Sequence, residues 1–217
     1  MITMAEKEKT TKSTSKQIEL PKTKLFGKWE NEAEFTDPGL KKYISIKPIV
    51  IPKSYGVASK QRFHKSKMHI VERLALHMLV PGHTGKHHKL SSGMLGGACD
   101  TILYSIEQSL QIIEEKTKTN PIQVVVKAIE NGAAIEEITS YQLGSITARD
   151  AVISSPQRRV DKTLRNIAQG VYKASFRKKK KIRDALADEL IAAYKGDSAS
   201  FAIKEKERVE REAVGAR

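Results

Sequence analysis

The amino-acid sequence predicts an all-α fold: a six-helix bundle with one protruding β-hairpin and a long basic N-terminal arm. Three observations support this prediction. Apolar residues recur at helical spacing in several separate segments between residues 66 and 212. Prolines, glycines and capping residues stand at the ends of most of these segments. One further stretch, residues 138–153, carries the turn signal of a β-hairpin instead.

Composition divides the chain into three parts. Residues 1–24 are rich in Lys, Thr, Ser and Glu and have little to bury, so we expect a disordered basic tail. Residues 25–63 regain apolar side chains, but prolines interrupt any long helix. We therefore expect an extended arm that lies either on the domain or on a partner. Residues 64–217 are expected to form the helical domain, with its hairpin at about 137–153.

The first three predicted helices are bounded by turn residues. The first runs from about Ser66 to Leu79 and ends before a Pro-Gly pair. The second follows a polar loop and runs from about Leu95 to Lys116. The third begins at Asn120-Pro121, a capping residue followed by proline at the first helical position, and ends at Gly132.

The predicted hairpin is centred on Leu143-Gly144-Ser145-Ile146. Gly144 takes the first central position, which suits a two-residue type II′ turn. Polar and apolar residues alternate poorly along the arms, so we expect the hairpin to project from the core rather than to pack against it. Tyr141 and Arg149 flank the turn, and Arg149 is the basic residue on its arms.

The helix that follows the hairpin has an apolar side and a basic side. It begins at Ser155-Pro156, with serine as the expected cap. At helical spacing, its apolar side holds Val160, Leu164, Ile167, Val171 and Ala174. Its basic side holds Arg158, Lys162, Arg165 and Lys173, together with Gln169. Two more helices are expected beyond it, one from Ile182 to about Gly196 and one from Phe201 to Glu212.

Positive charge is concentrated in residues 156–183, which hold eleven Lys or Arg side chains and a single Asp, a net charge of +10 in a chain of +14. Residues 1–70 add a second basic block of +8. The run Arg177-Lys178-Lys179-Lys180-Lys181 is most easily retained where a polyanion neutralises it. Nucleic acid is therefore the expected partner. A solvated basic face is the alternative, and a membrane surface fits less well because the helix lacks aromatic anchors.

No motif in the chain assembles a catalytic or metal-binding set. Gly82-His83-Thr84-Gly85-Lys86 lacks the spacing of a phosphate-binding loop. Its spacing is closer to a GxxG clamp for RNA, but the flanking strands that such a domain needs are not evident, so this alternative is not favoured. Three nearby histidines lack the paired cysteines of a zinc site, so we expect a basic loop that faces RNA through Lys86 and Lys89. Cys99 is expected to be a small buried thiol. The adjacent carboxylates Glu136-Glu137 are expected to be solvated. The chain is interpreted as a binding protein rather than an enzyme, without cofactor or metal.

Several blocks of the sequence occur in the same order in the small-subunit ribosomal protein seven family, which this chain resembles over roughly residues 25–217. The blocks are Ile70-Val71-Glu72-Arg73-Leu74, Asn120-Pro121-Ile122-Gln123-Val124, Ala128-Ile129-Glu130-Asn131, Ser155-Pro156-Gln157-Arg158-Arg159-Val160-Asp161, Leu164-Arg165-Asn166-Ile167-Ala168 and Ser200-Phe201-Ala202-Ile203-Lys204. In the arm, Leu25-Phe26-Gly27-Lys28-Trp29 and Asp37-Pro38-Gly39-Leu40-Lys41 resemble the archaeal and eukaryotic branch.

The resemblance implies a cytoplasmic protein of the ribosome that binds the 3′ major domain of small-subunit rRNA and helps to organise assembly of the head. It implies that the hairpin, here Leu143, Gly144, Ser145 and Ile146, lies near exit-site tRNA and the path of mRNA. It places the rRNA contacts on Arg158, Arg159, Lys162, Arg165 and residues 177–181. Neighbouring proteins of the head and platform are further expected partners. A free regulatory RNA-binding protein and a membrane or acidic-partner adaptor remain as alternatives.

Overall fold

The computed structural model describes residues 23–81, 83–84, 87–88 and 98–216. Six helices of ten or more residues account for about half of this part of the chain. They are α2 (Ile70–Leu79), α3 (Cys99–Thr117), α4 (Pro121–Gly132), α5 (Pro156–Ser175), α6 (Ile182–Lys195) and α7 (Phe201–Val214). They correspond to the six predicted helices, and the mostly helical fold is confirmed.

Smaller elements account for the difference from an all-α bundle. A four-residue helix, α1 (Pro38–Lys41), begins where the Asp37 carboxylate accepts a hydrogen bond from the Gly39 N–H. Two short 3₁₀ turns follow, at Val57–Ser59 and His64–Lys67. Three antiparallel strand pairs are present: β1 (Lys24–Leu25) with β2 (Trp29–Glu30), β3 (His83–Thr84) with β4 (His87–His88), and β5 (Glu136–Leu143) with β6 (Ile146–Ile153).

Local sequence signals fix most of the helix ends. The Asn120 side-chain oxygen accepts a hydrogen bond from the Ile122 N–H at 3.0 Å, and Pro121 follows at the first helical position. The Ser200 hydroxyl caps α7 in the same way. Ser155 occupies the capping position of α5, but its side chain makes no capping hydrogen bond. The predicted boundary is therefore confirmed there without its expected cap.

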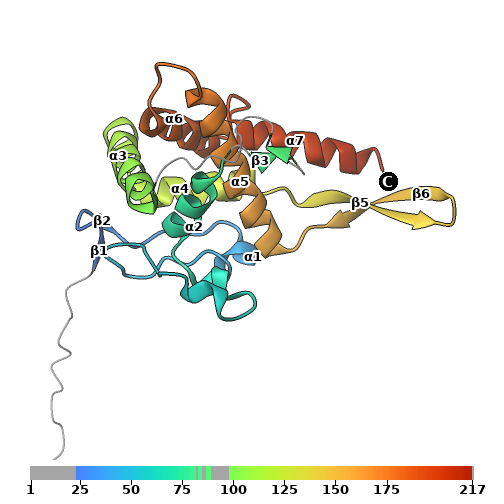
Figure 1. The fold of residues 1–217 in the computed structure, drawn as a ribbon, viewed down its shortest axis with the longest axis horizontal. Coiled ribbons are helices and arrows are strands. Elements are labelled where there is room, and N and C mark those ends of the chain that lie inside the picture. Colours follow the sequence, from blue (N-terminus) through green and yellow to red (C-terminus); the bar gives the residue numbers. More distant parts are fainter. Residues whose placement is uncertain (1–22, 82, 85–86, 89–97, 217) are drawn as a thin grey trace, which may run out of the picture.

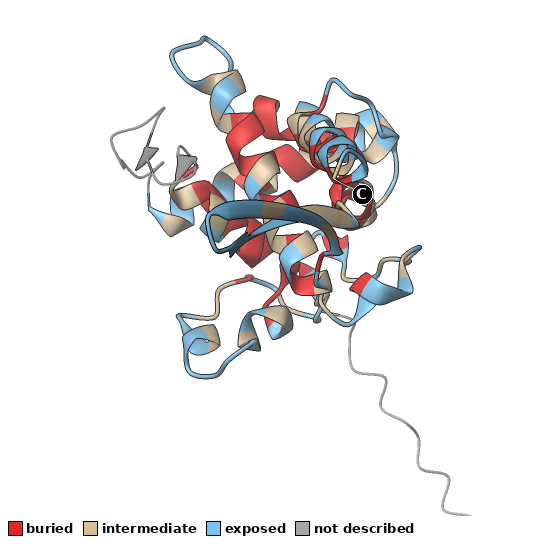
Figure 2. Ribbon diagram, turned by 90° about the vertical axis from the view of Figure 1, so that its right-hand side faces the viewer, coloured by how far each residue is buried: buried red, intermediate tan, exposed pale blue. Residues whose placement is uncertain are grey.

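The core lies where α5 and α6 pack against the other helices, and Figure 2 shows the buried residues gathered there. α5 contributes the predicted apolar side, with Val160, Leu164 and Ile167 fully buried. Gly170 lets this helix approach the start of α7, because a Cβ atom at this position would lie 2.8 Å from the Cβ of Phe201. A glycine that weakens helix propensity is thus retained for close packing.

The arm packs on the helical domain along much of its length (Figure 1). Leu25, Trp29, Leu40 and Ile44 belong to the same hydrophobic core as the long helices. The indole N–H of Trp29 donates to the Glu114 carboxylate at 2.8 Å. The sequence left open whether the arm lies on the domain or on a partner. These residues of the arm lie on the domain. The expected tail lies outside the described residues except at Thr23 and Lys24, and Lys24 opens β1.

The hairpin β5–β6 projects away from the helices (Figure 1). Every residue from 139 to 147 is exposed, so the predicted projection is confirmed. Gly144 adopts φ +60°, whereas Ser145 is not among the residues with positive φ. This combination fits the predicted type II′ turn, in which only the first central residue needs a left-handed conformation.

Candidate nucleic-acid interface

The basic side of α5 faces the end of the arm. Between them lies a groove of about 580 Å³, lined on the arm by Ala58 and residues 61–65 and on α5 by Gln157, Arg158, Lys162 and Arg165, among others. We call it the arm groove. Its position follows from two local features: the 3₁₀ turn at His64–Lys67 directs the arm toward α5, and the amphipathic pattern of α5 turns its basic side away from the core.

Two of the predicted rRNA contacts are held by a carboxylate of the hairpin. Arg158 Nη2 donates to Glu137 Oε2 at 3.0 Å, and Lys162 Nζ donates to the same oxygen at 2.9 Å. The Glu137 side chain is only 13% exposed. The expectation that the Glu136-Glu137 pair is solvated is therefore wrong for Glu137. The Glu137 carboxylate, 21 residues before Arg158 and 25 before Lys162, neutralises much of the charge at the start of α5.

The titration of Glu137 reflects these contacts. Burial acts to raise its pKa, but hydrogen bonds from Arg158, Lys162 and Ser154 outweigh burial and lower the pKa from 4.5 to about 2. The carboxylate is charged at neutral pH and joins the base of the hairpin to α5.

Arg159 is placed inside the protein. Its side chain is 12% exposed, pairs with Asp37 Oδ2 at 3.0 Å and donates from Nε to the Ala134 carbonyl at 3.2 Å. These bonds link α5 to the arm and to the end of α4. Arg159 therefore has an internal, structural role.

Arg165 differs from these neighbours because it is exposed and forms no ion pair with any residue that the structure describes. Gln169, which the sequence assigns to the same side, is 8% exposed. That assignment is wrong, because α5 is covered by other elements over a wider arc near its middle than the helical pattern indicates. Arg158 is also exposed but is paired with Glu137, so the exposed cations of α5 that form no ion pair with the described residues are Arg165 and Lys173. The Lys173 ammonium lies 3.7 Å from the centre of the Phe201 ring.

Asp161, the single acidic residue of the basic stretch 156–183, ties the arm groove to α2. Arg73 Nη2 lies 2.8 Å from its carboxylate, and Lys65 also pairs with it. Burial acts to raise the pKa of Asp161, but hydrogen bonds from His77, Lys65 and Arg73 hold it well below its usual range. Lys65 is thus positioned on the groove wall by an internal ion pair.

The run Arg177–Lys181 forms the loop between α5 and α6. Arg177 adopts φ +53° beside the stacked rings of Tyr172 and Phe176, whose centres lie 5.0 Å apart. Lys180 pairs with Asp188 at 2.7 Å. Lys178, Lys179 and Lys181 are exposed, and no ion pair joins them to the described part of the chain.

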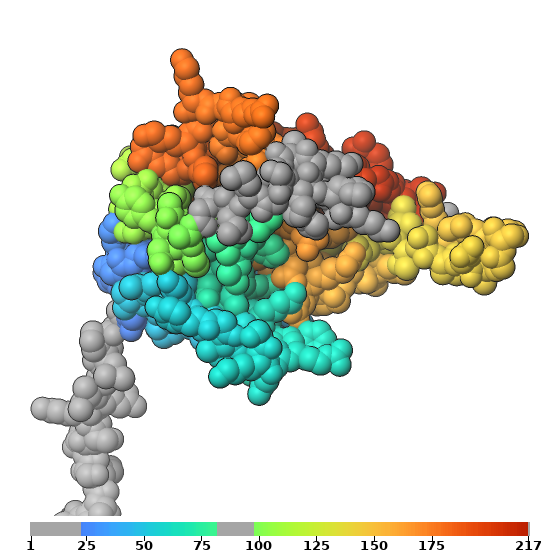
Figure 3. All heavy atoms as spheres, in the orientation of Figure 1, coloured from blue at the N-terminus to red at the C-terminus, as the bar shows by residue number. Residues whose placement is uncertain are grey.

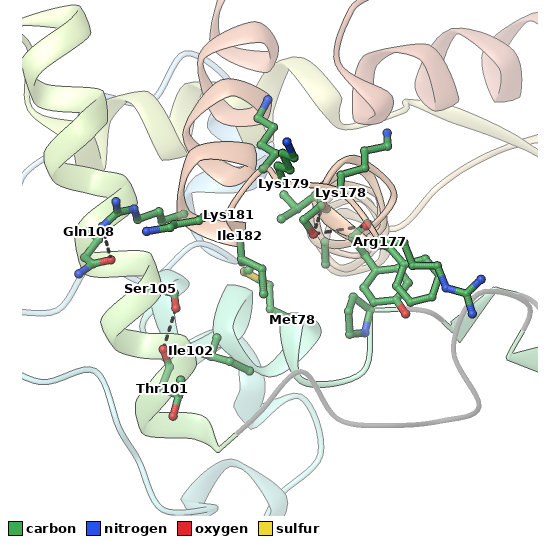
Figure 4. Close-up of a pocket in the computed structure, with 18 residues that line it drawn as sticks. Met78, Thr101, Ile102, Ser105, Gln108, Arg177, Lys178, Lys179, Lys181 and Ile182 are labelled. Carbon is green, nitrogen blue, oxygen red and sulfur yellow. Dashed lines mark hydrogen bonds between the residues drawn. The ribbon is translucent and has the colours of Figure 1, made fainter.

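Beneath this loop lies a second hollow, of about 670 Å³, which we call the loop hollow. Figure 4 shows the residues of α3, among them Thr101, Ser105 and Gln108, on one side and the 177–181 loop on the other. A smaller hollow between them shares Arg165 with the arm groove and Pro81 with the loop hollow. The three therefore follow one another along α5, a helix of 20 residues, or about 30 Å.

The hairpin presents a different chemistry. The Tyr141 hydroxyl donates to Asp150 Oδ2 at 2.7 Å on one face of the hairpin. Leu143 and Ile146 are exposed beside the turn, and Arg149 is the basic residue on the two strands. The tip is therefore apolar and nearly uncharged, unlike the surface along α5.

Some sequence predictions fall outside the described residues. Lys86 and Lys89, both predicted to contact RNA, are among them. So are Gly82 and Gly85 of the GxxG sequence, although His83–Thr84 and His87–His88 pair as β3 and β4. Cys99 begins α3 and is half-buried. Within the described ranges, no group of three or more His, Cys, Asp or Glu side chains is arranged to hold a metal ion, and no helix is long and apolar enough to cross a membrane.

The sequence analysis missed the arm's share of this candidate interface. Arg62, Phe63 and Lys65 line the arm groove, and Figure 3 shows this part of the arm standing out at the surface. A signal was present, because residues 60–67 hold four Lys or Arg side chains around one phenylalanine. Cations interleaved with an aromatic residue are typical of RNA-binding segments.

The chain is similar to known proteins over a stretch that includes the arm groove, α5 and the 177–181 loop. The family described as ribosomal protein S7p/S5e matches residues 40–217. The chain is 44% identical over 197 residues to the small ribosomal subunit protein uS7 of Nanoarchaeum equitans, an alignment that covers 90% of this chain and 100% of that protein. It is 45% identical over 197 residues to uS7 of Methanococcus maripaludis, with 89% of this chain and 98% of that protein covered.

Proposed function

Because the chain belongs to the ribosomal protein S7p/S5e family, we propose that it is a structural constituent of the small ribosomal subunit, binds the 3′ major domain of small-subunit rRNA and helps to organise assembly of the head. The observation that supports this most directly is the path of hollows along α5. Exposed cations that form no ion pair with the described residues stand at intervals along it: Arg62, Arg165, Lys178, Lys179 and Lys181.

The path suits a sugar–phosphate backbone for an electrostatic reason. Cations that are not neutralised within the protein can displace the counterions of a polyanion, and the release of these counterions drives binding. The aromatic rings near both ends, Phe63 and Phe176, offer stacking surfaces for bases that leave a helix. Phosphate contacts position the RNA, so the same surface serves a protein whose role is to organise rRNA.

Reconstitution tests this proposal. Small-subunit rRNA and the other small-subunit proteins of an archaeon would be assembled with and without the full-length chain. We expect the chain to remain with small subunits through a high-salt wash, and head assembly to fail when it is omitted. Release of the chain at moderate salt, with normal heads in its absence, would contradict a structural role. The same result would favour a free regulatory RNA-binding protein.

For the hairpin, we propose a position near exit-site tRNA and the path of mRNA. The supporting observation is its shape: an exposed hairpin with few charges extends beyond the helices that carry the rRNA surface. Gly144→Val places a β-branched residue at φ +60°, which distorts the turn and spares the core. We expect normal occupancy of the variant in small subunits and altered dissociation of exit-site tRNA. Normal dissociation at full occupancy would contradict this role.

A further inference from the structure

The arm groove combines features that a surface for backbone phosphates does not require. Five of its lining side chains are Lys or Arg, among them Arg62 and Arg165, which form no ion pair within the described residues. At its mouth, Phe63 is 69% exposed and the Arg62 guanidinium lies 5.8 Å from the centre of its ring. An aromatic face beside free cations is the arrangement that holds an unstacked nucleobase and its flanking phosphates.

The backbone holds Phe63 in this exposed position at a cost. Phe63 adopts φ +60°, a left-handed conformation that bulky side chains rarely occupy. Such strain persists only where the surrounding structure imposes it, and strained residues cluster at binding sites. Here the fold places a large apolar ring in solvent although the neighbouring core contains many apolar side chains. The exposed ring therefore adds little to the stability of the fold, and it does not offset the backbone strain.

From these features we propose that the arm groove binds one unpaired nucleotide of the RNA, with its base stacked on Phe63 and the adjacent phosphates near Arg62 and Arg165. The proposal rests on the function proposed above and specifies one contact within it. A peptide fits less well, because the groove is lined by five cations and one carboxylate, Asp161, which is already paired with Lys65 and Arg73. The volume of about 580 Å³ lies within the range of about 300–1,000 Å³ typical of small-ligand pockets.

The chain offers a matched control for a test of Phe63. Tyr55 is also an exposed aromatic residue of the arm, at 84%, with φ +50° and with Lys53 lying 5.0 Å from its ring centre. Tyr55 is not among the residues that line the arm groove. Comparing the two positions separates a specific stacking site from a general effect of exposed aromatic rings.

The experiment measures the affinity of the full-length protein for a transcript of the 3′ major domain of archaeal small-subunit rRNA over a range of salt concentrations. Loss of one base–aromatic stack weakens binding at least about fivefold, so we expect Phe63→Ala to show this loss. The slope of log affinity against log salt should not change, because Phe63 carries no charge. Phe63→Trp should restore the affinity, and Tyr55→Ala should bind within about twofold of the unmodified protein.

A second readout reports the stack directly. We expect the emission of the tryptophan introduced by Phe63→Trp to be quenched when the transcript is added, and that of Tyr55→Trp to change little. Equal affinities for Phe63→Ala and Tyr55→Ala, with steep salt dependence retained, would overturn the nucleotide site and leave the proposed function standing. Salt-insensitive or absent binding by the unmodified protein would overturn both.

Discussion

The first turns of α5 and the loop beyond its last turn have similar compositions and different surroundings. In the first turns, Arg158 and Lys162 share the Glu137 carboxylate, while Arg159 pairs with Asp37. In the loop, only Lys180 has an ion-pair partner in the described structure, Asp188. The first set joins the hairpin and the arm to the helix, whereas the second is free to meet another molecule. The number of cations in a segment therefore does not measure the charge that it offers to a partner.

The largest effect should come from the loop. Replacing Lys178, Lys179 and Lys181 by alanine removes three exposed cations without leaving an internal carboxylate unpaired. At about 1 kcal/mol for each exposed contact, we expect rRNA affinity to fall on the order of 100-fold. The slope of log affinity against log salt should decrease by about two to three. Filter binding over a salt series checks both values, and an unchanged slope would contradict contact with phosphates.

Within α5, Arg165 and Lys162 give a closer comparison, because they lie one turn apart on the same helix. We expect Arg165→Ala to weaken rRNA binding about fivefold, at about 1 kcal/mol for an exposed contact. Lys162→Ala should weaken it less than twofold, because Glu137 already neutralises this side chain. The same binding assay decides the matter. Equal losses for the two variants would mean that Lys162 exchanges Glu137 for phosphate on binding.

Glu137→Gln should act in the opposite direction. Removing this charge frees Arg158 and Lys162 from their ion pairs, so we expect rRNA affinity to rise about two- to threefold. The free energy of unfolding should fall, because the hairpin loses its charged link to α5. A variant that binds more weakly would show that Glu137 holds the two cations in the position that RNA requires.

The pH dependence of stability gives a check that does not involve RNA. The pKa of Glu137 is lowered from 4.5 to about 2 on folding. Its stabilising effect is therefore present above about pH 4.5 and is lost as the pH falls toward 2. Denaturant unfolding of the protein and of Glu137→Gln should show a difference in stability at pH 7 that shrinks over this window.

The smallest change in rRNA affinity is expected from the loop's ion pair, Lys180 with Asp188. Asp188→Asn releases two lysines from their ion pairs, Lys180 in the loop and Lys116 on α3. Because only one of them belongs to the loop, rRNA affinity should rise by less than about twofold. An increase larger than that of Glu137→Gln would reverse our ranking of the two regions. It would mean that Lys180 is the central cation of the loop.

The sequence predicted the fold well wherever the determining signal was local. Asn120-Pro121, Ser155-Pro156 and Gly196 mark helix ends that the structure places at the same residues. The family resemblance is confirmed as well. Glu137, by contrast, meets Arg158 only because β5 and β6 pair in one particular register and return the chain to the start of α5. No pattern of spacing in the sequence encodes that meeting.

Only the part of the candidate site that depends on local sequence signals was predicted. Arg165 and the lysines of the 177–181 loop were identified from charge and helical periodicity, which are local properties. Gln169 was assigned to the basic side of the helix, and Arg159 was expected to contact rRNA from the family resemblance, but other elements cover both side chains. The arm's contribution needed the knowledge that residues 61–65 lie across from α5, about 100 residues later in the chain.

The way the arm is held has a consequence for synthesis of the chain. Its backbone is bonded by side chains of α4 and its N-cap. The Asn120 amide donates to the Glu30 carbonyl, and the Glu130 carboxylate accepts from the N–H groups of Thr36 and Asp37, 94 and 93 residues away. At about 5–20 residues per second, the arm is made roughly 5–20 s before the helix on which it rests. During that interval Leu25 and Trp29 have no core to enter. The order of translation, rather than the stability of the finished protein, then sets when this segment is most exposed to aggregation.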